Sequence, residues 1–210
     1  MGIALITSKM IAVFVGPGGM AYIGNFRNFM TSLEGISTLA FSSGVVKYVG
    51  ENEDKEKELT KIITTVLVTF LVFSTVLGFL IFVFSDFLCA KFFGNNLQYE
   101  IVFKVVAIVL PFSVVSVLFV SIINGLGSYS KLIYATIISN IIALVLTVLL
   151  IYEFKLVGAL LSTALNPTIL FTINFFYVPK ELQLLSRINL KQYDFSVLKK
   201  LAGFSIMILP

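Results

Sequence analysis

An all-α bundle of membrane-spanning helices is the fold class that this sequence predicts, and three observations predict it. The chain of 210 residues is 58% hydrophobic and only 12% charged, with a mean hydropathy of +1.02, whereas soluble domains are about 45–50% apolar and about 25% charged. The apolar residues gather in long runs, many of them near the roughly 20 residues with which a helix crosses a bilayer. The basic residues fall mainly in the gaps between these runs. We therefore expect a polytopic membrane protein.

Composition also excludes several classes of function. The sequence has no His, no Trp and one Cys, Cys89. A disulfide within the chain and a thiolate or imidazole metal cluster are excluded by that set, and we expect no cofactor. A nucleophile–base pair and a P-loop ending in Gly-Lys-Ser/Thr are missing as well, so an enzyme is not expected. The net charge is +4, but the basic residues lie mainly between the apolar runs, as in membrane proteins, which argues against nucleic acid as a partner.

Seven apolar segments follow one another along the chain. Their bounds are 1–15, 21–49, 60–86, 100–123, 131–152, 156–178 and 197–210. We expect an N-terminal lobe of six helices over 1–179, an amphipathic connector over 180–196 on the inner leaflet, and the start of a seventh helix over 197–210. The first segment is short and the last stops at Pro210, which suggests a fragment lacking a second lobe. A late start site is the alternative for the short first helix.

The basic residues predict how these helices are oriented. The gaps after the second, fourth and sixth segments hold Lys47, Lys55, Lys57, Lys61, Lys131, Lys180, Arg187, Lys191, Lys199 and Lys200. The opposite gaps and helix ends, with short outer loops near 16–20, 87–99 and 153–155, hold Lys91, Lys104 and Lys155. The positive-inside rule places the richer side, and with it the N-terminus, in the cytoplasm. The charged run 51–58 is then a cytoplasmic turn with i,i+4 pairs such as Glu53–Lys57; docking of a partner there is the alternative.

The second segment carries charges that a membrane helix rarely tolerates. Arg27 and Glu34 lie between apolar residues, and a charge at the bilayer centre costs about 2.5–3.5 kcal/mol on insertion scales. We expect Arg27 to line a water-filled cavity, with Glu34 about 10.5 Å deeper along the axis as its partner across a bridging group. Lys9 and Lys47 would extend this basic lining, which favours an anionic substrate such as a diphosphate. Placement at the membrane interface is the alternative for each cation.

The same segment also carries a stripe of small and polar residues. Its members, at steps of three and four, are Gly24, Asn28, Thr31, Gly35, Thr38 and Ser42. Close packing against another helix is the favoured interpretation of the Gly and Thr members, because small residues let membrane helices approach. Asn28 and Thr31 adjoin the face of Arg27 and Glu34, so they are also candidates for substrate contacts.

Two prolines are candidate hinges. Pro111 interrupts the fourth segment, and Asn166-Pro167 interrupts the sixth. A proline inside a helix removes one backbone hydrogen bond and kinks the helix, and bent helices flank the substrate path in transporters. Fixed kinks without movement are the alternative. Residues 124–129, Asn-Gly-Leu-Gly-Ser-Tyr, predict a tight turn between the fourth and fifth helices.

Short blocks of residues carry a family resemblance. They are Lys9-Met10-Ile11-Ala12-Val13, Val15-Gly16-Pro17-Gly18-Gly19, Gly24-Asn25-Phe26-Arg27 and Ser43-Gly44-Val45-Val46-Lys47-Tyr48-Val49. They resemble the start of Wzx-type flippases, which translocate O-antigen or enterobacterial common antigen units on undecaprenyl diphosphate. Val157-Gly158-Ala159-Leu160 is similar to a Gly-Ala signature of the wider superfamily of multidrug, oligosaccharidyl-lipid and polysaccharide exporters.

The resemblance implies two six-helix lobes around a cationic cavity in the bacterial inner membrane. The chain would hold the first lobe and translocate a lipid-linked oligosaccharide by alternating access, with Arg27 and Lys47 at positions that match the family. Membrane lipid and the missing C-terminal lobe are implied partners, and a polysaccharide polymerase and a chain-length regulator are further candidates. Two alternatives stay open. One is a cation-coupled multidrug exporter of the same superfamily, and the other a membrane-embedded polysaccharide polymerase or glycosyltransferase.

Overall fold

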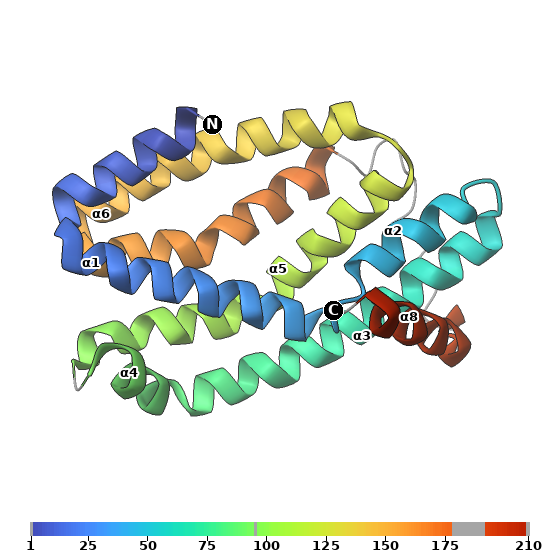
Figure 1. The fold of residues 1–210 in the computed structure, drawn as a ribbon, viewed down its shortest axis with the longest axis horizontal. Coiled ribbons are helices and arrows are strands. Elements are labelled where there is room, and N and C mark those ends of the chain that lie inside the picture. Colours follow the sequence, from blue (N-terminus) through green and yellow to red (C-terminus); the bar gives the residue numbers. More distant parts are fainter. Residues whose placement is uncertain (1, 95, 178–191, 209–210) are drawn as a thin grey trace.

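The fold is a bundle of helices, seen in a computed structural model that describes residues 2–94, 96–177 and 192–208 (Figure 1). The elements are α1 (Gly2–Ser37), α2 (Ser42–Glu51), α3 (Glu56–Val83), α4 (Ser85–Phe93), the 3-10 turn η1 (Leu97–Tyr99), α5 (Glu100–Gly125), α6 (Tyr129–Tyr177) and α8 (Phe195–Ile208). These ranges contain no strand, and three stretches are long and apolar enough to cross a membrane: Glu56–Val83, Leu97–Gly125 and Tyr129–Phe176. The predicted all-α membrane helix bundle is confirmed, while the number of spans stays a prediction.

Helices α1 and α6 are each bent, so each consists of two helical arms. The backbone leaves helical geometry at Gly16 (φ 77°, ψ 175°) in α1 and at Lys155 (φ 50°, ψ −121°) in α6. The arms of α6 touch directly, because a Cβ added to Gly158 would overlap the carbonyl oxygen of Leu150. At 1.5 Å per residue each arm of α6 exceeds roughly 30 Å, the thickness of the hydrocarbon core. The long helix α6 is thus a hairpin that corresponds to the two segments expected over 131–152 and 156–178.

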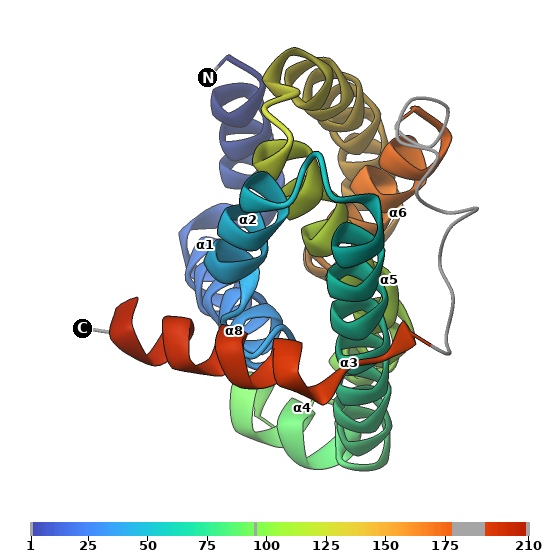
Figure 2. The ribbon, with the colours of Figure 1, turned by 90° about the vertical axis from the view of Figure 1, so that its right-hand side faces the viewer.

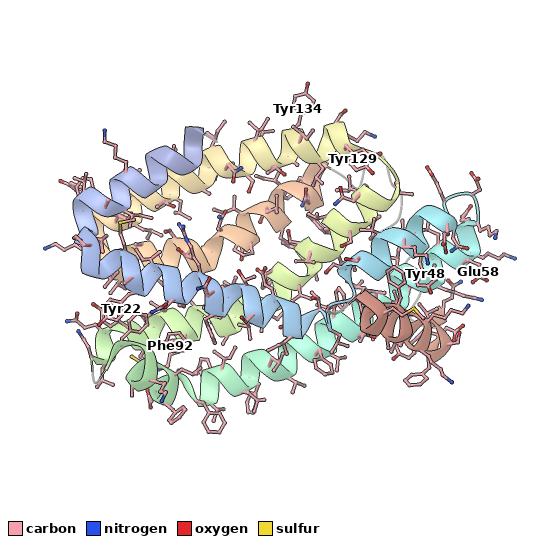
Figure 3. All side chains as sticks on the ribbon, viewed as in Figure 1. Tyr22, Tyr48, Glu58, Phe92, Tyr129 and Tyr134 are labelled. Carbon is pink, nitrogen blue, oxygen red and sulfur yellow. The ribbon has the colours of Figure 1, made fainter. Side chains whose placement is uncertain are left out.

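The connections lie at two opposite ends of the bundle. The α2–α3 and α5–α6 turns lie at one end, and the bends of α1 and α6 lie with α4 at the other (Figure 1). Tyr22 and Phe92 lie at the second end, whereas Tyr48, Glu58 and Tyr129 lie at the first (Figure 3). Successive connections thus lie at alternate ends of the bundle, as the order of apolar segments predicts. Which end faces the cytoplasm stays a prediction. The part of the expected amphipathic connector that holds Lys180, Arg187 and Lys191 lies outside the described residues.

Helix α5 forms the centre of the bundle. It packs against α2, α3, α4 and α6. Its buried apolar side chains include Val102, Phe103, Val106, Leu110, Val114, Leu118 and Ile122. Phe103 also meets Phe29 and Phe92 at ring-centroid distances of 5.8 and 5.7 Å. The stretch 87–99 was expected to be an outer loop, and this expectation is wrong for α4 and η1: burying aromatic side chains against α1 and α5 stabilises helical structure there.

The expected continuous helix over 21–49 is also wrong, because it breaks at residues 38–41. The N–H of Leu39 donates to the carbonyl of Ile36 at 3.0 Å, and the N–H of Ala40 donates to that of Gly35 at 3.0 Å. These two bonds form a Schellman ending, whose left-handed residue is usually Gly. Here Leu39 and Ala40 have φ values of 51° and 53°. A left-handed conformation costs a residue with a Cβ about 1–2 kcal/mol, so the break carries strain that other contacts must offset.

Helix α8 supplies one such contact by lying across the break. The Ser205 hydroxyl donates to the carbonyl of Ala40 at 3.2 Å, and Figure 2 shows α8 crossing α3 beside α2. Asp194 begins α8, since its carboxylate accepts from the N–H of Ser196 at 2.8 Å, the usual role of an N-cap aspartate. Hydrogen bonds from the Ser196 hydroxyl and N–H hold the pKa of Asp194 below its ordinary value. The seventh apolar segment therefore packs on the rest of the bundle at this break.

The charged turn after α2 has other ion pairs than the expected Glu53–Lys57. Among the described residues of this region, Lys47 pairs with Glu51 at 3.9 Å and Lys61 pairs with Glu58 at 3.1 Å. Residues 52–54 form a turn and α3 begins at Glu56, so Glu53 and Lys57 do not share one helix. These exposed pairs add little to stability, about 0–1 kcal/mol each.

The contact between α3 and α5 generates a test of the packing. A Cβ added to Gly78 would lie 2.6 Å from the backbone carbonyl oxygen of Ala107, whereas a Cβ at Gly35 would meet nothing within 4 Å. We predict that Gly78→Ala lowers the free energy of unfolding by about 1–3 kcal/mol, because the two backbones must separate. Gly35→Ala should leave stability unchanged or slightly raised, since Ala favours a helix over Gly. Reaction of the buried Cys89 thiol with a fluorogenic maleimide during heating reports the unfolding midpoint; equal midpoints for the two variants contradict this packing.

Candidate functional site

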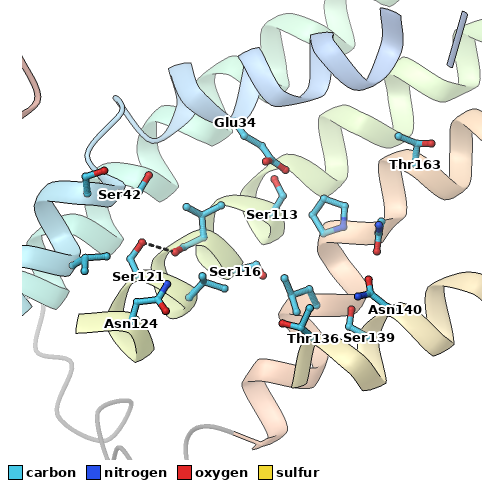
Figure 4. Close-up of a pocket in the computed structure, with 17 residues that line it drawn as sticks. Glu34, Ser42, Ser113, Ser116, Ser121, Asn124, Thr136, Ser139, Asn140 and Thr163 are labelled. Carbon is cyan, nitrogen blue, oxygen red and sulfur yellow. Dashed lines mark hydrogen bonds between the residues drawn. The ribbon is translucent and has the colours of Figure 1, made fainter. Parts of the chain in front are cut away.

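A polar pocket opens inside the bundle between α1, α2, α5 and α6 (Figure 4). Its volume is about 520 Å³, within the roughly 300–1,000 Å³ of pockets that hold small molecules. Its polar lining residues are Glu34, Ser42, Ser43, Ser113, Ser116, Ser121, Asn124, Thr136, Ser139, Asn140, Thr163 and Asn166. The apolar ones are Val46, Val117, Val120, Pro167 and Leu170. Hydroxyl and amide groups in a membrane bundle are costly unless they have partners, so their convergence marks a candidate binding site.

Helical spacing explains how α5 and α6 supply this lining. Residues 113, 116–117, 120–121 and 124 recur every three or four positions and so share one face of α5. The first arm of α6 contributes 136 and 139–140, and its second arm contributes 163, 166–167 and 170 in the same spacing. Much of the rest of α5 packs in the apolar core, while Ile101, Ile108 and Phe112 are exposed. The polar face of this central helix therefore forms one wall, and the α6 hairpin forms the wall opposite to it.

Glu34 is the one charged side chain among the described residues that line the pocket. It lies in the last turn of α1, and the break after it turns the chain so that Ser42 and Ser43 of α2 also line the pocket. Figure 4 shows the Glu34 carboxylate pointing toward Ser113 of α5. The Glu34 backbone is satisfied separately, because its carbonyl accepts from the Thr38 hydroxyl at 2.8 Å. The carboxylate is therefore directed at whatever occupies the pocket.

Ser116 places a buried hydroxyl without a hydrogen-bond partner in the wall of the pocket. The residue is 2% exposed, and its hydroxyl oxygen has no hydrogen-bond partner. The neighbouring hydroxyls on the same face are satisfied, since Ser113 donates to the carbonyl of Leu110 at 2.8 Å and Ser121 donates to that of Val117 at 2.9 Å. A buried polar group without a partner costs about 1–3 kcal/mol. Such a cost at a lining position is typical of a group that binds a ligand.

The structure brings only part of the expected site together. Glu34 and Pro167 line the pocket, whereas Lys9, Arg27, Asn28, Thr31 and Lys47 are exposed and are not among its lining residues. No ion pair joins Arg27 to Glu34 in the described part of the chain. Lys47 pairs with Glu51, and its ammonium group lies 4.5 Å from the ring centroid of Phe204 on α8. A basic lining shared by Lys9, Arg27 and Lys47 thus stays a prediction, separate from this pocket.

The stripe of small residues on α1 is open over most of its length. A Cβ added to Gly24 or Gly35 would meet nothing within 4 Å, and Asn28 and Thr31 are exposed. The expected close packing is therefore wrong for Gly24 and Gly35 against the described residues. Only the end of the stripe is covered, where Thr38 is 2% exposed. The face that carries Arg27 lies uncovered by the described part of this chain.

The helix around each candidate hinge is uninterrupted, in α5 for Pro111 and in the second arm of α6 for Pro167. Pro111 of α5 and Pro167 of α6 interrupt neither helix, and the departures from helical geometry inside the described helices are at Gly16 and Lys155. Pro167 nevertheless belongs to the pocket wall. Whether either proline acts as a hinge stays a prediction.

Sequence reasoning missed the serines and asparagines of α5 and α6. Each is unremarkable alone, because Ser and Thr in helices commonly donate to the carbonyl one turn before them. The signal was their shared spacing in two apolar segments, Ser113, Ser116, Ser121 and Asn124 in one and Thr136, Ser139 and Asn140 in the other. That spacing predicts a polar face on each helix, and two polar faces in a membrane bundle are expected to meet.

These features define a polytopic membrane protein with a polar pocket inside a helix bundle. The chain belongs to the family of polysaccharide biosynthesis proteins, which matches it over residues 27–209. It is similar to the lipid III flippases of Escherichia coli strain K12 and Shigella flexneri, with 30% identity over 109 residues in each case. That match covers 52% of this chain and 26% of each relative. The comparisons confirm the resemblance to flippases of lipid-linked oligosaccharides, and no solved structure matches the chain.

The unpartnered hydroxyl of Ser116 leads to a prediction about stability. We predict that Ser116→Ala leaves the unfolding midpoint of the ligand-free protein unchanged or raises it, because it removes a buried group without a partner. Ser113→Ala is the matched variant one turn earlier, and losing its bond to Leu110 should cost about 1 kcal/mol. The same thiol-reactivity melt compares the two. If both variants lower the unfolding midpoint equally, the Ser116 hydroxyl does have a hydrogen-bond partner, contrary to this prediction.

Proposed function

We propose that this chain forms one lobe of a flippase that moves undecaprenyl-diphosphate-linked oligosaccharide, an O-antigen or related repeat unit, across the bacterial inner membrane. The observation that carries the proposal is the exposed Arg27 on an open face of α1, in a chain of the polysaccharide biosynthesis family. A guanidinium presents a planar fork of donors that suits phosphate oxygens. The relatives named lipid III flippases support the class of cargo.

The open face of α1 is where a second lobe would approach. Gly24 and Gly35 leave room there, and Arg27, Asn28 and Thr31 would then face a cavity between the lobes rather than lipid. A charge in that position avoids the cost of direct exposure to hydrocarbon. Lys9, at the other arm of α1, and Lys47, beside the break, would add positive charge at other depths of the same cavity.

Alternating access would arise by rocking of the lobes about the break in the second segment. The α-helical bonding pattern stops at Leu39 and Ala40, whose N–H groups bond three and five residues back, so the chain can change its angle there, and α8 contacts the break through Ser205. Helix α8 begins the region expected to lead into the second lobe, so its movement would act directly on the break. Pro111 and Pro167 would let α5 and α6 bend with it.

The orientation and the partners complete the proposal. The end that holds the α2–α3 turn, with Lys55, Lys57 and Lys61, would face the cytoplasm, and so would the N-terminus. The C-terminal lobe and the lipid-linked substrate are the partners that the mechanism needs. A polysaccharide polymerase and a chain-length regulator would act on the product after translocation.

A second candidate is the export of organic cations, and one observation favours it. Glu34 is an acid in a pocket whose described lining holds no basic residue, and a carboxylate there attracts cations. The neutral hydroxyl and amide groups around it suit an uncharged polar ligand better than a lipophilic cation. We therefore rank this function second.

The role of Arg27 generates the test of the proposed function. Arg27→Ala should lower surface polysaccharide about ten- to a hundred-fold in a strain that lacks its own flippase, because it removes charge-assisted bonds worth about 1.5–3 kcal/mol. Arg27→Lys should restore part of the loss, since an ammonium keeps the charge without the fork. Lys57→Ala, an exposed charge in the α2–α3 turn, is the control. Unchanged surface polysaccharide in Arg27→Ala at equal protein level would sink the proposal, and loss of drug resistance instead would favour the second candidate.

A further inference from the structure

The pocket and the Arg27 face differ in charge although they share one helix. Seven residues separate Arg27 from Glu34, about 10.5 Å along the axis and almost the same angular position. Arg27 is exposed on the open face, whereas Glu34 points into the pocket. A ligand that contacts both must therefore carry negative charge at one end and be neutral or positive at the other.

The lining of the pocket excludes a phosphate group as its natural occupant. No lysine or arginine is among the described lining residues, and the single charge is the carboxylate of Glu34. Two anions placed together in a site of low dielectric repel each other strongly. The diphosphate of the proposed substrate would therefore stay near Arg27, outside the pocket.

Neutral hydroxyl and amide groups match a saccharide. Each sugar hydroxyl both donates and accepts, as do the Ser and Thr hydroxyls here, while Asn124, Asn140 and Asn166 offer both kinds of group on one side chain. Ser116 has an unpartnered hydroxyl in the wall of the pocket. The C–H faces of a sugar ring need apolar contacts as well, and Val117, Val120 and Leu170 supply them. A volume of about 520 Å³ is more than one bare ion needs.

We propose that this pocket is a saccharide subsite, which holds a sugar next to the diphosphate of the lipid-linked oligosaccharide. Glu34 accepts hydrogen bonds from sugar hydroxyls or from an amino substituent, and Ser116 gains the partner that it lacks. The subsite rests on the proposed function, because it takes the sugar of the same cargo. It also assigns the two parts of that cargo to different places: the diphosphate to the open face of α1, and the sugar to the interior of the bundle.

Cysteine protection tests this subsite in the full-length protein in lipid nanodiscs. Cys89, the one cysteine in these 210 residues, is first replaced by Ala, together with any cysteine in the rest of the full-length protein. Asn140→Cys on α6 and Ser43→Cys on α2 then report on the pocket from two sides, since both are exposed lining residues. Ser32→Cys, exposed on α1 and not among the lining residues, is the matched control. Each variant is labelled with N-ethylmaleimide alone and again in the presence of three kinds of probe, each tested separately.

The probes are the oligosaccharide released by mild acid from the strain's own lipid carrier, undecaprenyl diphosphate without sugar, and tetraphenylphosphonium or sodium chloride as cations. The released oligosaccharide should slow labelling of Asn140→Cys and Ser43→Cys at least five-fold and leave Ser32→Cys unchanged. Adding Ser116→Ala should raise the concentration for half protection roughly three- to ten-fold, the weight of one hydrogen bond. Protection by undecaprenyl diphosphate or by a cation, without protection by the oligosaccharide, overturns the subsite. So does the absence of protection by every probe.

Transport in the same cysteine-free background separates this proposal from the proposed function. If the protein moves lipid-linked oligosaccharide but the pocket cysteines stay unprotected, the subsite is wrong and the function stands. If the protein with its natural sequence moves no lipid-linked oligosaccharide, the proposed function itself is wrong.

Discussion

The backbone break at residues 38–41 is the constraint on which the rest of the site depends. A helix that stops inside an apolar bundle leaves carbonyl and N–H groups without their helical partners, and lipid offers them none. Here the Schellman bonds of Leu39 and Ala40 satisfy two donors, the hydroxyls of Ser37 and Thr38 donate to carbonyls of the last turn, and Ser205 of α8 reaches the carbonyl of Ala40. The break is thereby stable enough to exist, and it directs Glu34 and the start of α2 into the same pocket.

This arrangement places the basic side chains and the neutral polar side chains of the pocket in different parts of the molecule. Arg27 and Lys47 lie on open surfaces, Arg27 on α1 and Lys47 between Glu51 and Phe204. The interior receives hydroxyl and amide groups, which cost less to bury than a charge does. A cargo with an anionic head and a neutral polyhydroxylated body has the same division, and this correspondence links the fold to the proposed translocation.

Sequence patterns predicted the elements that depend on local hydropathy and missed those that depend on tertiary contacts. The apolar segments 60–86 and 100–123 correspond to α3 and α5, and the glycines of 124–129 mark the turn, where Gly127 has a φ of 66°. The break was not predictable, because Leu39-Ala40 carries no turn signal and part of its stability comes from Ser205, 165 residues away. The helix α4 likewise depends on aromatic packing against α1 and α5. For the site, a single charged residue such as Glu34 is easily recognised in an apolar segment of the sequence. Serines that bond within their own helices are not.

The most direct measurement of the central claim is a structure of the full-length protein in nanodiscs with its lipid-linked oligosaccharide bound. We predict diphosphate density beside Arg27, sugar density between Glu34 and Ser116, and a non-helical backbone over 38–41. Diphosphate density inside the pocket, or one continuous helix through 21–49, would contradict it.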